Sequence, residues 1–153
     1  MYQVLVFVHV VCAIIWVGGA FFAQLLAIRV QRASDPNELP SFARNVEFLG
    51  TRVFLPASIL LFIAGAGMVA QAWSFGQLWV AVAMALWLLS ALLGSLYIGP
   101  RTKKIAELFE AEGPTSIGAR ALLDKVFLVS RLELLSFAVI VALMVFKPGS
   151  GVA

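Results

Sequence analysis

The segment VFLPASILLFIAGAGMVAQAW, residues 53–73, contains no charged side chain. A helix needs about 20 mostly apolar residues to cross the hydrocarbon core of a bilayer, so this segment predicts a transmembrane helix. Three further segments are long and apolar enough to do the same: roughly residues 4–28, 77–98 and 126–146. None alternates apolar and polar residues with a period of two, which excludes spanning strands. The sequence therefore predicts an all-α, integral membrane four-helix bundle.

The composition of the whole chain favours the same class. Of its 153 residues, 62% are hydrophobic and 12% are charged, and the mean hydropathy is +1.00. A soluble domain is typically about half apolar and a quarter charged. We expect residues 1–153 to form one transmembrane domain that contacts the lipid bilayer. The formal net charge of +3 is spread among acidic residues without a basic face, which excludes a nucleic-acid partner. Cys12 is the only cysteine, so no internal disulfide is possible.

Lysine and arginine are distributed unevenly between the two sides of the predicted membrane. Of the 11 such residues, all except Lys147 lie between the first and second spans, between the third and fourth, or near the ends of those spans. Cytoplasmic segments carry an excess of positive charge. The sequence therefore predicts that both of these connecting segments are cytoplasmic and that both chain termini lie outside.

Each cytoplasmic segment also has apolar residues at helical spacing. They are ELPSFARNVEFLGTR, residues 38–52, and RTKKIAELFEAEGP, residues 101–114. Their periodicity predicts short amphipathic helices in the two loops, lying at the membrane surface. Recruitment of a soluble partner is the alternative interpretation.

Small residues recur at four-residue spacing in three of the spans. Such stripes allow helix backbones to approach closely in lipid, so they predict one compact bundle. A homodimer or a membrane complex would use the same stripes, so the oligomeric state stays open. The small residues are Gly19, Ala23 and Ala27; AGAG at residues 64–67; and Ala91, Ser95 and Gly99, with Ser90 and Gly94 beside them.

His9 is the only histidine, and it lies in the outer part of the first span. His9, Cys12 and Trp16 occur at i, i+3 and i+7, so they share one helix face. Imidazole is a common ligand of haem iron, copper and zinc. This face therefore predicts binding of haem b or a copper ion through His9. The alternative is a histidine that donates one hydrogen bond to a neighbouring helix.

Three methionines map to the same outer level as His9 and Cys12: Met68, Met84 and Met144. Thioether, thiol and imidazole groups together suit Cu(I), and a histidine–methionine pair can ligate haem. Methionine also fills irregular gaps in apolar cores, which is the alternative. Trp16 and Trp87 lie near the middle of the predicted membrane, where they would form walls for a flat cofactor or serve as large packing residues.

Glu133 lies about two turns into the fourth span from the cytoplasmic side. An ionisable residue inside a span is costly and is a functional-site hypothesis by default. Arg52 enters the second span at a similar depth, so we expect a buried Glu133–Arg52 ion pair. Such a pair is usually structural, but it also suits a proton path or a contact with an anionic substrate, and Gln24 would extend it.

Three stretches resemble a family of predicted bacterial integral membrane proteins that is itself similar to copper-resistance D-type proteins and, more distantly, to HemJ-type protoporphyrinogen oxidases. They are HVVCAIIWVGGAFFAQLLAIR (9–29), RVFLPASILLFIAGAGMV (52–69) and LYIGPRTKK (96–104). The resemblance implies a multi-pass protein of the bacterial inner membrane with His9 as a haem or copper ligand. The chain lacks the further histidines of both groups, so the second ligand would come from a methionine or from His9 of a homodimer partner.

Three functions therefore stay open: a haem- or copper-binding membrane protein, a transporter or proton-linked carrier that uses Glu133 and Arg52, and a non-catalytic accessory subunit of a membrane complex. The sequence disfavours a hydrolase, because it has no nucleophile–base motif, no phosphate-binding loop and no zinc motif. We expect no enzymatic activity, although a haem-linked redox role stays open.

Overall fold

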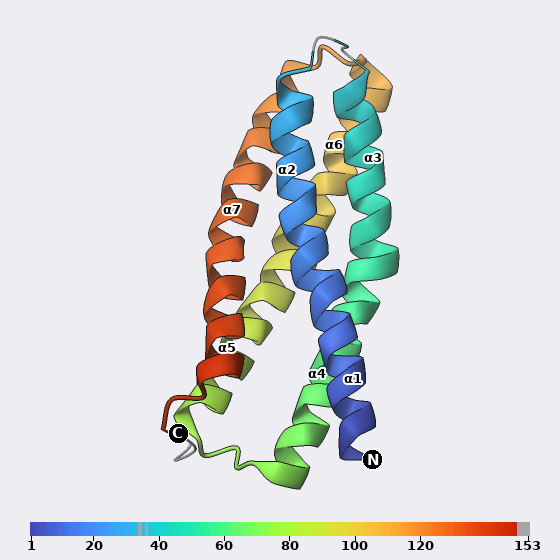
Figure 1. The fold of residues 1–153 in the computed structure, drawn as a ribbon. Helices are drawn as coiled ribbons and strands as arrows, with labels where there is room; N and C mark the ends of the chain where they lie inside the picture. The colour runs from blue at the N-terminus through green and yellow to red at the C-terminus, as the bar shows by residue number, and fades with distance from the viewer. Residues whose placement is uncertain (34, 36, 150–153) are drawn as a thin grey trace.

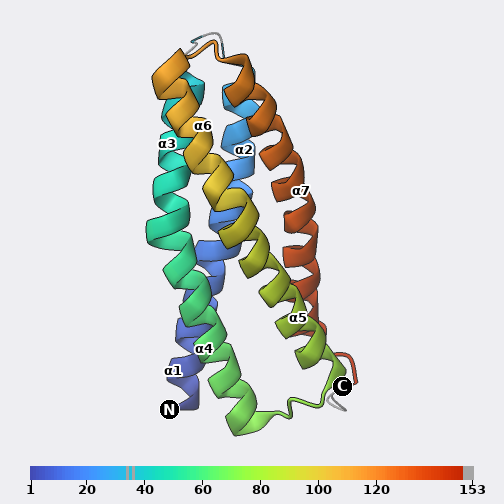
Figure 2. The same cartoon turned by 180° about the vertical axis from the view of Figure 1, so that it is seen from behind.

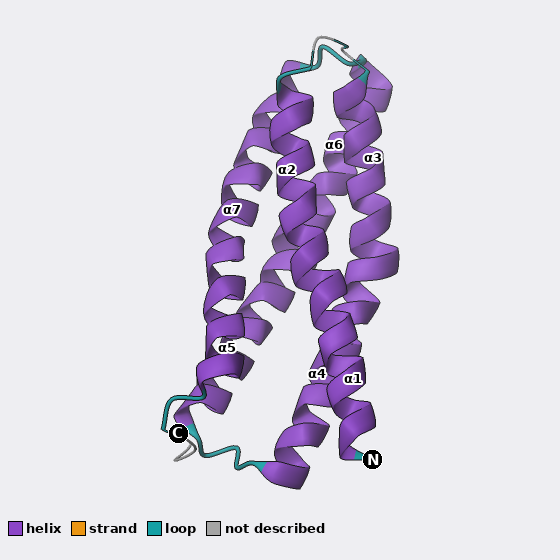
Figure 3. Cartoon of the chain, viewed as in Figure 1, coloured by secondary structure: helices purple, strands orange, loops and turns teal. Residues whose placement is uncertain are grey.

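The computed structural model describes residues 1–33, 35 and 37–149 of the chain, and within them all regular structure is helical (Figure 3). Three short π-helical segments, η1 to η3, interrupt the α-helices. The elements in chain order are α1 (Tyr2–Ala13), η1 (Ile14–Gly18), α2 (Gly19–Gln31), α3 (Glu38–Leu49), η2 (Gly50–Phe54), α4 (Leu55–Ala72), α5 (Leu78–Leu92), η3 (Leu93–Ile98), α6 (Gly99–Glu112) and α7 (Ile117–Phe146).

These elements join into four long helices, each long and apolar enough to cross a membrane: Tyr2–Gln31, Glu38–Ala72, Leu78–Glu112 and Ile117–Phe146. They run side by side as one bundle (Figure 1). Both termini and the α4–α5 link lie at one end, which we call the terminal end. The other two links lie at the opposite end, which we call the α3–α6 end (Figure 2). The predicted all-α, four-span bundle is confirmed, and the orientation of its termini across a membrane stays a prediction.

Large apolar side chains cover the outside of the bundle. Phe7 is 69% exposed, Leu96 is 70% exposed and Leu135 is 65% exposed. Soluble proteins rarely expose apolar surface on this scale, so these faces are the ones that contact lipid.

The two segments expected to be short surface helices are helical, but they are not separate. α3 continues through η2 into α4, and α5 continues through η3 into α6. At 1.5 Å per residue, the four long helices of 30 to 35 residues extend for about 45–53 Å, beyond the roughly 30 Å of a hydrocarbon core. The four long helices are therefore longer than a hydrocarbon core is thick.

The apolar faces of those two segments pack against each other instead of lying on a membrane. Ala43 and Ile105 are fully buried, and Ala119 in α7 is fully buried beside them. Leu39, Phe42 and Phe109 belong to the same cluster, which we call the α3–α6 core. Helical periodicity shows that a segment has an apolar face, but it does not show whether lipid or protein covers that face.

Proline accounts for two of the three π-helical segments. Pro56 and Pro100 are the second residues of α4 and α6, directly after η2 and η3. Proline has no N–H to donate and its ring crowds the carbonyl four residues earlier, here at positions 52 and 96, inside the two π-helical segments. Each of these two long helices therefore has one wider turn, with one extra residue, before the regular α-helix resumes.

Candidate binding cavity

A partly open cavity of about 540 Å³ lies inside the bundle, next to the α3–α6 core. All four long helices contribute to its wall. Aromatic side chains of the cavity include Trp16, Phe42, Phe54, Phe127 and Phe137. A volume of this size is within the usual range for small-molecule sites, which are mostly apolar with a few polar groups.

Small residues create this space. Ala23, Ser90, Ala91, Gly94 and Ser95 all line the cavity, although their spacing predicted close helix packing. A Cβ atom added at Gly94, or at Gly50 on the opposite wall, would meet no other atom within 4 Å. The stripe on α4 behaves as predicted, because a Cβ at Gly67 would lie 3.1 Å from Leu5 in α1. Small residues thus bring α1 and α4 together at one level and leave a cavity at another.

All three π-helical segments contribute to the cavity wall. η1 contributes Trp16, η2 contributes Gly50, Thr51 and Phe54, and η3 contributes Gly94, Ser95 and Ile98. Single π-helical turns inside α-helices occur frequently at functional sites. Their convergence on one cavity is the first indication that the space has a function.

Two polar side chains of the cavity wall lie deep inside the bundle. Glu133 in α7 is partly buried, and Gln24 in α2 is only 8% exposed. The Oε1 atom of Gln24 has no hydrogen-bond partner among the described residues. A buried acceptor without a partner is rare and costly, so a donor from a bound molecule or a water would stabilise this part of the wall.

Most hydroxyl groups of the wall present an oxygen lone pair, not a hydrogen, to the cavity. Ser58 donates to Leu55 O at 2.9 Å and Ser95 donates to Ala91 O at 2.7 Å. Thr51 and Thr102 donate in the same way to the carbonyls of Glu47 and Ile98. Because their hydrogens are used inside their own helices, these groups are left as acceptors.

Ser90 follows the same pattern through an intermediate residue. Ser136 donates to the backbone carbonyl of Glu133 at 2.7 Å, and the oxygens of Ser90 and Ser136 are 3.3 Å apart. Because the hydrogen of Ser136 is already donated, Ser90 donates to Ser136. The cavity-facing lone pairs of Ser90 are then acceptors as well.

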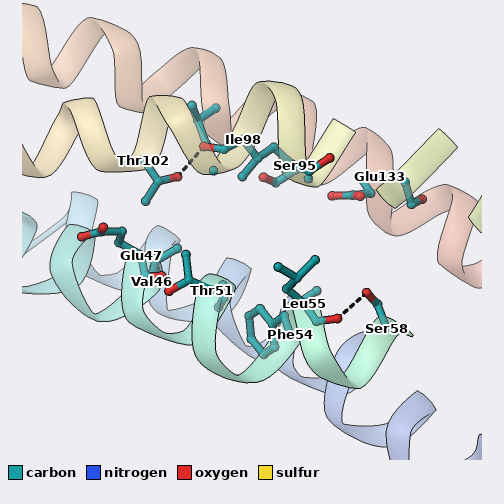
Figure 4. Close-up of a pocket in the computed structure, with 18 of the residues that line it drawn as sticks. Val46, Glu47, Thr51, Phe54, Leu55, Ser58, Ser95, Ile98, Thr102 and Glu133 are labelled. Carbon is teal, nitrogen blue, oxygen red and sulfur yellow. Dashed lines mark hydrogen bonds between the residues drawn. The ribbon is translucent and has the colours of Figure 1, made fainter. Parts of the chain in front are cut away.

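The exposed residues of the cavity wall all lie on the second and third long helices: Thr51, Leu55, Ser95, Pro100 and Lys103. The opening of the cavity therefore lies along the seam between these two helices. These helices pack closely where α3 meets α6, and α4 and α5 diverge from there toward the terminal end (Figures 1 and 2). In Figure 4, Thr51 and Leu55 on one helix face Ser95 and Ile98 on the other across the cavity. Glu47 and Lys103 line it toward the α3–α6 end.

The expected Glu133–Arg52 ion pair does not form. Arg52 is exposed, and the ion pairs among the described residues are Arg44–Glu110 and Lys103–Glu107. The ion pair was expected because the two residues lie at a similar depth in the membrane. Depth alone does not show whether two side chains point toward each other. Gln24, expected to extend that pair, lines the same cavity as Glu133.

His9 lies between the first and second long helices and is not among the residues that line the cavity. Its Nδ1 atom is 2.9 Å from the carbonyl oxygen of Leu61. Because a carbonyl only accepts, Nδ1 carries the hydrogen of this bond, and in the neutral form of imidazole the lone pair is then on Nε2. A Cβ at Gly65 would lie 3.0 Å from the imidazole ring, so this glycine makes room for His9. The interhelical hydrogen bond given above as the alternative is present.

The five predicted soft ligands do not gather in one place. Cys12 is buried with Trp16, Leu61 and Phe137. Met84 and Met144 pack against a different cluster around Val69, Trp79 and Val80. Met68 belongs to neither cluster, and no group of three or more His, Cys, Asp or Glu side chains that could hold a metal ion occurs within the described part of the chain.

Trp16 and Trp87 lie in the same cluster, as their shared depth suggested. Trp16 contacts the ring of Phe137, with ring centres 4.6 Å apart. Trp87 stacks on Phe62 at 4.1 Å and donates its indole N–H to Ser58 O at 3.2 Å. Of the two, only Trp16 lines the cavity.

Comparison with known proteins identifies one family. A family model described as a predicted integral membrane protein, DUF2269, matches residues 3–148. No curated protein and no solved structure matches the chain.

Proposed function

The chain belongs to the DUF2269 family of predicted integral membrane proteins, and we propose that it binds a small membrane-soluble molecule in the central cavity and acts as an intramembrane carrier. The observation that carries the proposal is the cavity of about 540 Å³, which small residues and three π-helical segments hold open between all four long helices. The opening between the second and third long helices gives a ligand access from the side. Glu133 is partly buried in the cavity wall. Because an ionisable residue inside a span is costly, its presence there supports a role in carrying a ligand.

Filling the cavity tests this function. Gly94→Phe places a ring in the open space in front of Gly94, so it should remove labelling of cavity residues by an uncharged photoreactive fatty alcohol in lipid nanodiscs. Leu96→Phe is the matched control, because Leu96 lies in the same π-helical segment and is 70% exposed. Peptide mapping by mass spectrometry reads out the labelled residues, and thermal unfolding checks that both variants fold. Equal cavity labelling in both variants would contradict the proposal.

A second candidate, binding of haem b or copper through His9, is supported by one observation. The hydrogen bond from Nδ1 to Leu61 O fixes the ring and leaves Nε2 as a possible ligand atom. Histidine ligands in metalloproteins are commonly held in this way. Haem fits this donor better than a five-ligand copper site does, because Met84 and Met144 pack in a different cluster from Cys12. Bound haem would supply redox chemistry, and His9 would hold and orient it.

The absorption spectrum of the purified protein, oxidised and dithionite-reduced, tests this candidate. Haem ligation by His9 should give a Soret band that is absent in His9→Ala and retained in Cys12→Ser. Stoichiometric copper without a Soret band would instead favour the soft-ligand set. A colourless and metal-free protein, purified from cells supplied with haem precursor and copper, would contradict both.

A further inference from the structure

We propose that the ligand of the cavity is a lipophilic cation, meaning an apolar body with one amine-type, hydrogen-bond-donating head group. This inference rests on the proposed function and names its substrate class. It is argued from the polarity and charge of the cavity wall.

The charges of the cavity wall favour a cation. Three ionisable residues line the cavity: Glu47, Lys103 and Glu133. Lys103 is 67% exposed, and its Nζ lies 3.9 Å from a Glu107 oxygen on its own helix. The single positive group is thus paired at the edge of the cavity, while Glu133 is partly buried in a wall that also contains Trp16, Phe127 and Phe137. An ammonium group is the complement of a carboxylate in such surroundings.

The hydrogen-bonding capacity of the wall points the same way. Thr51, Ser58, Ser90, Ser95 and Thr102 have already donated their hydrogens inside the protein, and Gln24 Oε1 lacks a partner among the described residues. The remaining donors of the wall are fewer: the hydroxyl of Ser130, the amide nitrogen of Gln24, the indole N–H of Trp16 and, at the edge, the ammonium of Lys103. An ammonium has three donors and no acceptor, so it matches this wall, whereas a carboxylate head group would face oxygen atoms.

The aromatic side chains suit both parts of such a ligand. Trp16, Phe42, Phe54, Phe127 and Phe137 line the cavity. Their faces attract cations, and their area covers an apolar body. The seam between the second and third long helices would let that body enter from the acyl-chain region while the head group reaches Glu133.

Three photoreactive amphiphiles with the same alkyl chain, ending in an ammonium, a hydroxyl or a carboxylate, test the proposal. Each is added to the full chain in nanodiscs of zwitterionic lipid, and labelling of cavity residues is quantified by peptide mapping. Labelling of the lipid-facing residues near Leu96 normalises for partitioning into the bilayer. We expect the normalised cavity labelling by the ammonium probe to exceed that by the carboxylate probe by at least about tenfold, because like charges repel strongly in a confined site.

Glu133→Gln keeps the size of the side chain and removes its charge. In this variant we expect the ammonium and carboxylate probes to label the cavity within about twofold of each other. Equal labelling by all three probes, or a preference for the carboxylate, in the unmodified protein would overturn the ligand class and leave the binding function intact. If Gly94→Phe does not reduce cavity labelling by any of the three probes, the binding function itself is overturned.

Discussion

Replacing Ile105 by alanine is expected to lower the free energy of unfolding by about 2–5 kcal/mol, the usual cost of truncating a buried aliphatic side chain. Ile105 is fully buried in the α3–α6 core, among Ala43, Phe109 and Ala119. Truncation would leave a void between three of the four long helices where they project beyond the predicted span boundaries. Denaturant unfolding in a single detergent, followed by circular dichroism, measures the loss.

Lys104→Ala is the control for this experiment. Lys104 is the preceding residue on the same helix and is exposed, so its truncation should change stability by less than about 0.5 kcal/mol. If both variants unfold at the same denaturant concentration, residues 101–112 do not contribute to a protein core. The sequence-based expectation of a separate helix on the membrane surface would then be correct.

Gly65→Val is expected to cost about 1–3 kcal/mol, the range for overpacking a close-packed site. A Cβ at Gly65 would lie 3.0 Å from Cε1 and 3.1 Å from Nδ1 of His9, and valine adds two methyl groups beyond that Cβ. The imidazole would have to move and release the carbonyl of Leu61. Thermal unfolding in detergent measures the loss, with Ala70→Val on the exposed face of α4 as the control.

The same contact predicts a rescue. His9→Ala removes the ring that the valine meets, so the double variant His9→Ala with Gly65→Val should be more stable than additivity of the single variants allows. Residues in direct contact typically show coupling energies of about 0.5–3 kcal/mol. Strict additivity would show that His9 does not pack on Gly65.

The fold could be predicted because the bilayer imposes simple rules. A long apolar segment such as residues 53–73 is stable in lipid only as a helix, so the four spans can be predicted from length and apolar content. Residues 38–52 and 101–112 are less constrained. Their apolar faces suit either a membrane surface or each other, and only the structure shows that Ala43 and Ile105 are buried in a shared core.

The candidate site could be predicted only in part, for a similar reason. Glu133 stands out in the sequence because a carboxyl group inside a span is costly. Its neighbours across the cavity cannot be found from depth alone. Similar depth predicted an ion pair with Arg52, and this pair is not among those of the described residues. Ser90, Gly94 and Ser95 were recognised as a stripe of small residues, but such a stripe allows helices to touch and equally allows them to leave a space.

The π-helical segments have a consequence for insertions and deletions during evolution. Each holds one residue more than a regular α-helix of the same rise, and each residue turns an α-helix by about 100°. Deleting one residue within η1, η2 or η3 would restore regular α-helical winding there. Because the wider turn absorbs the extra residue, the two halves of that long helix would keep their relative orientation, whereas the same deletion in a regular α-helical stretch would rotate one half against the other. In an alignment of the family, a one-residue gap at positions 14–18, 50–54 or 93–98 would therefore mark relatives that lack the wider turn but whose residues on the two sides of the gap still face a common cavity.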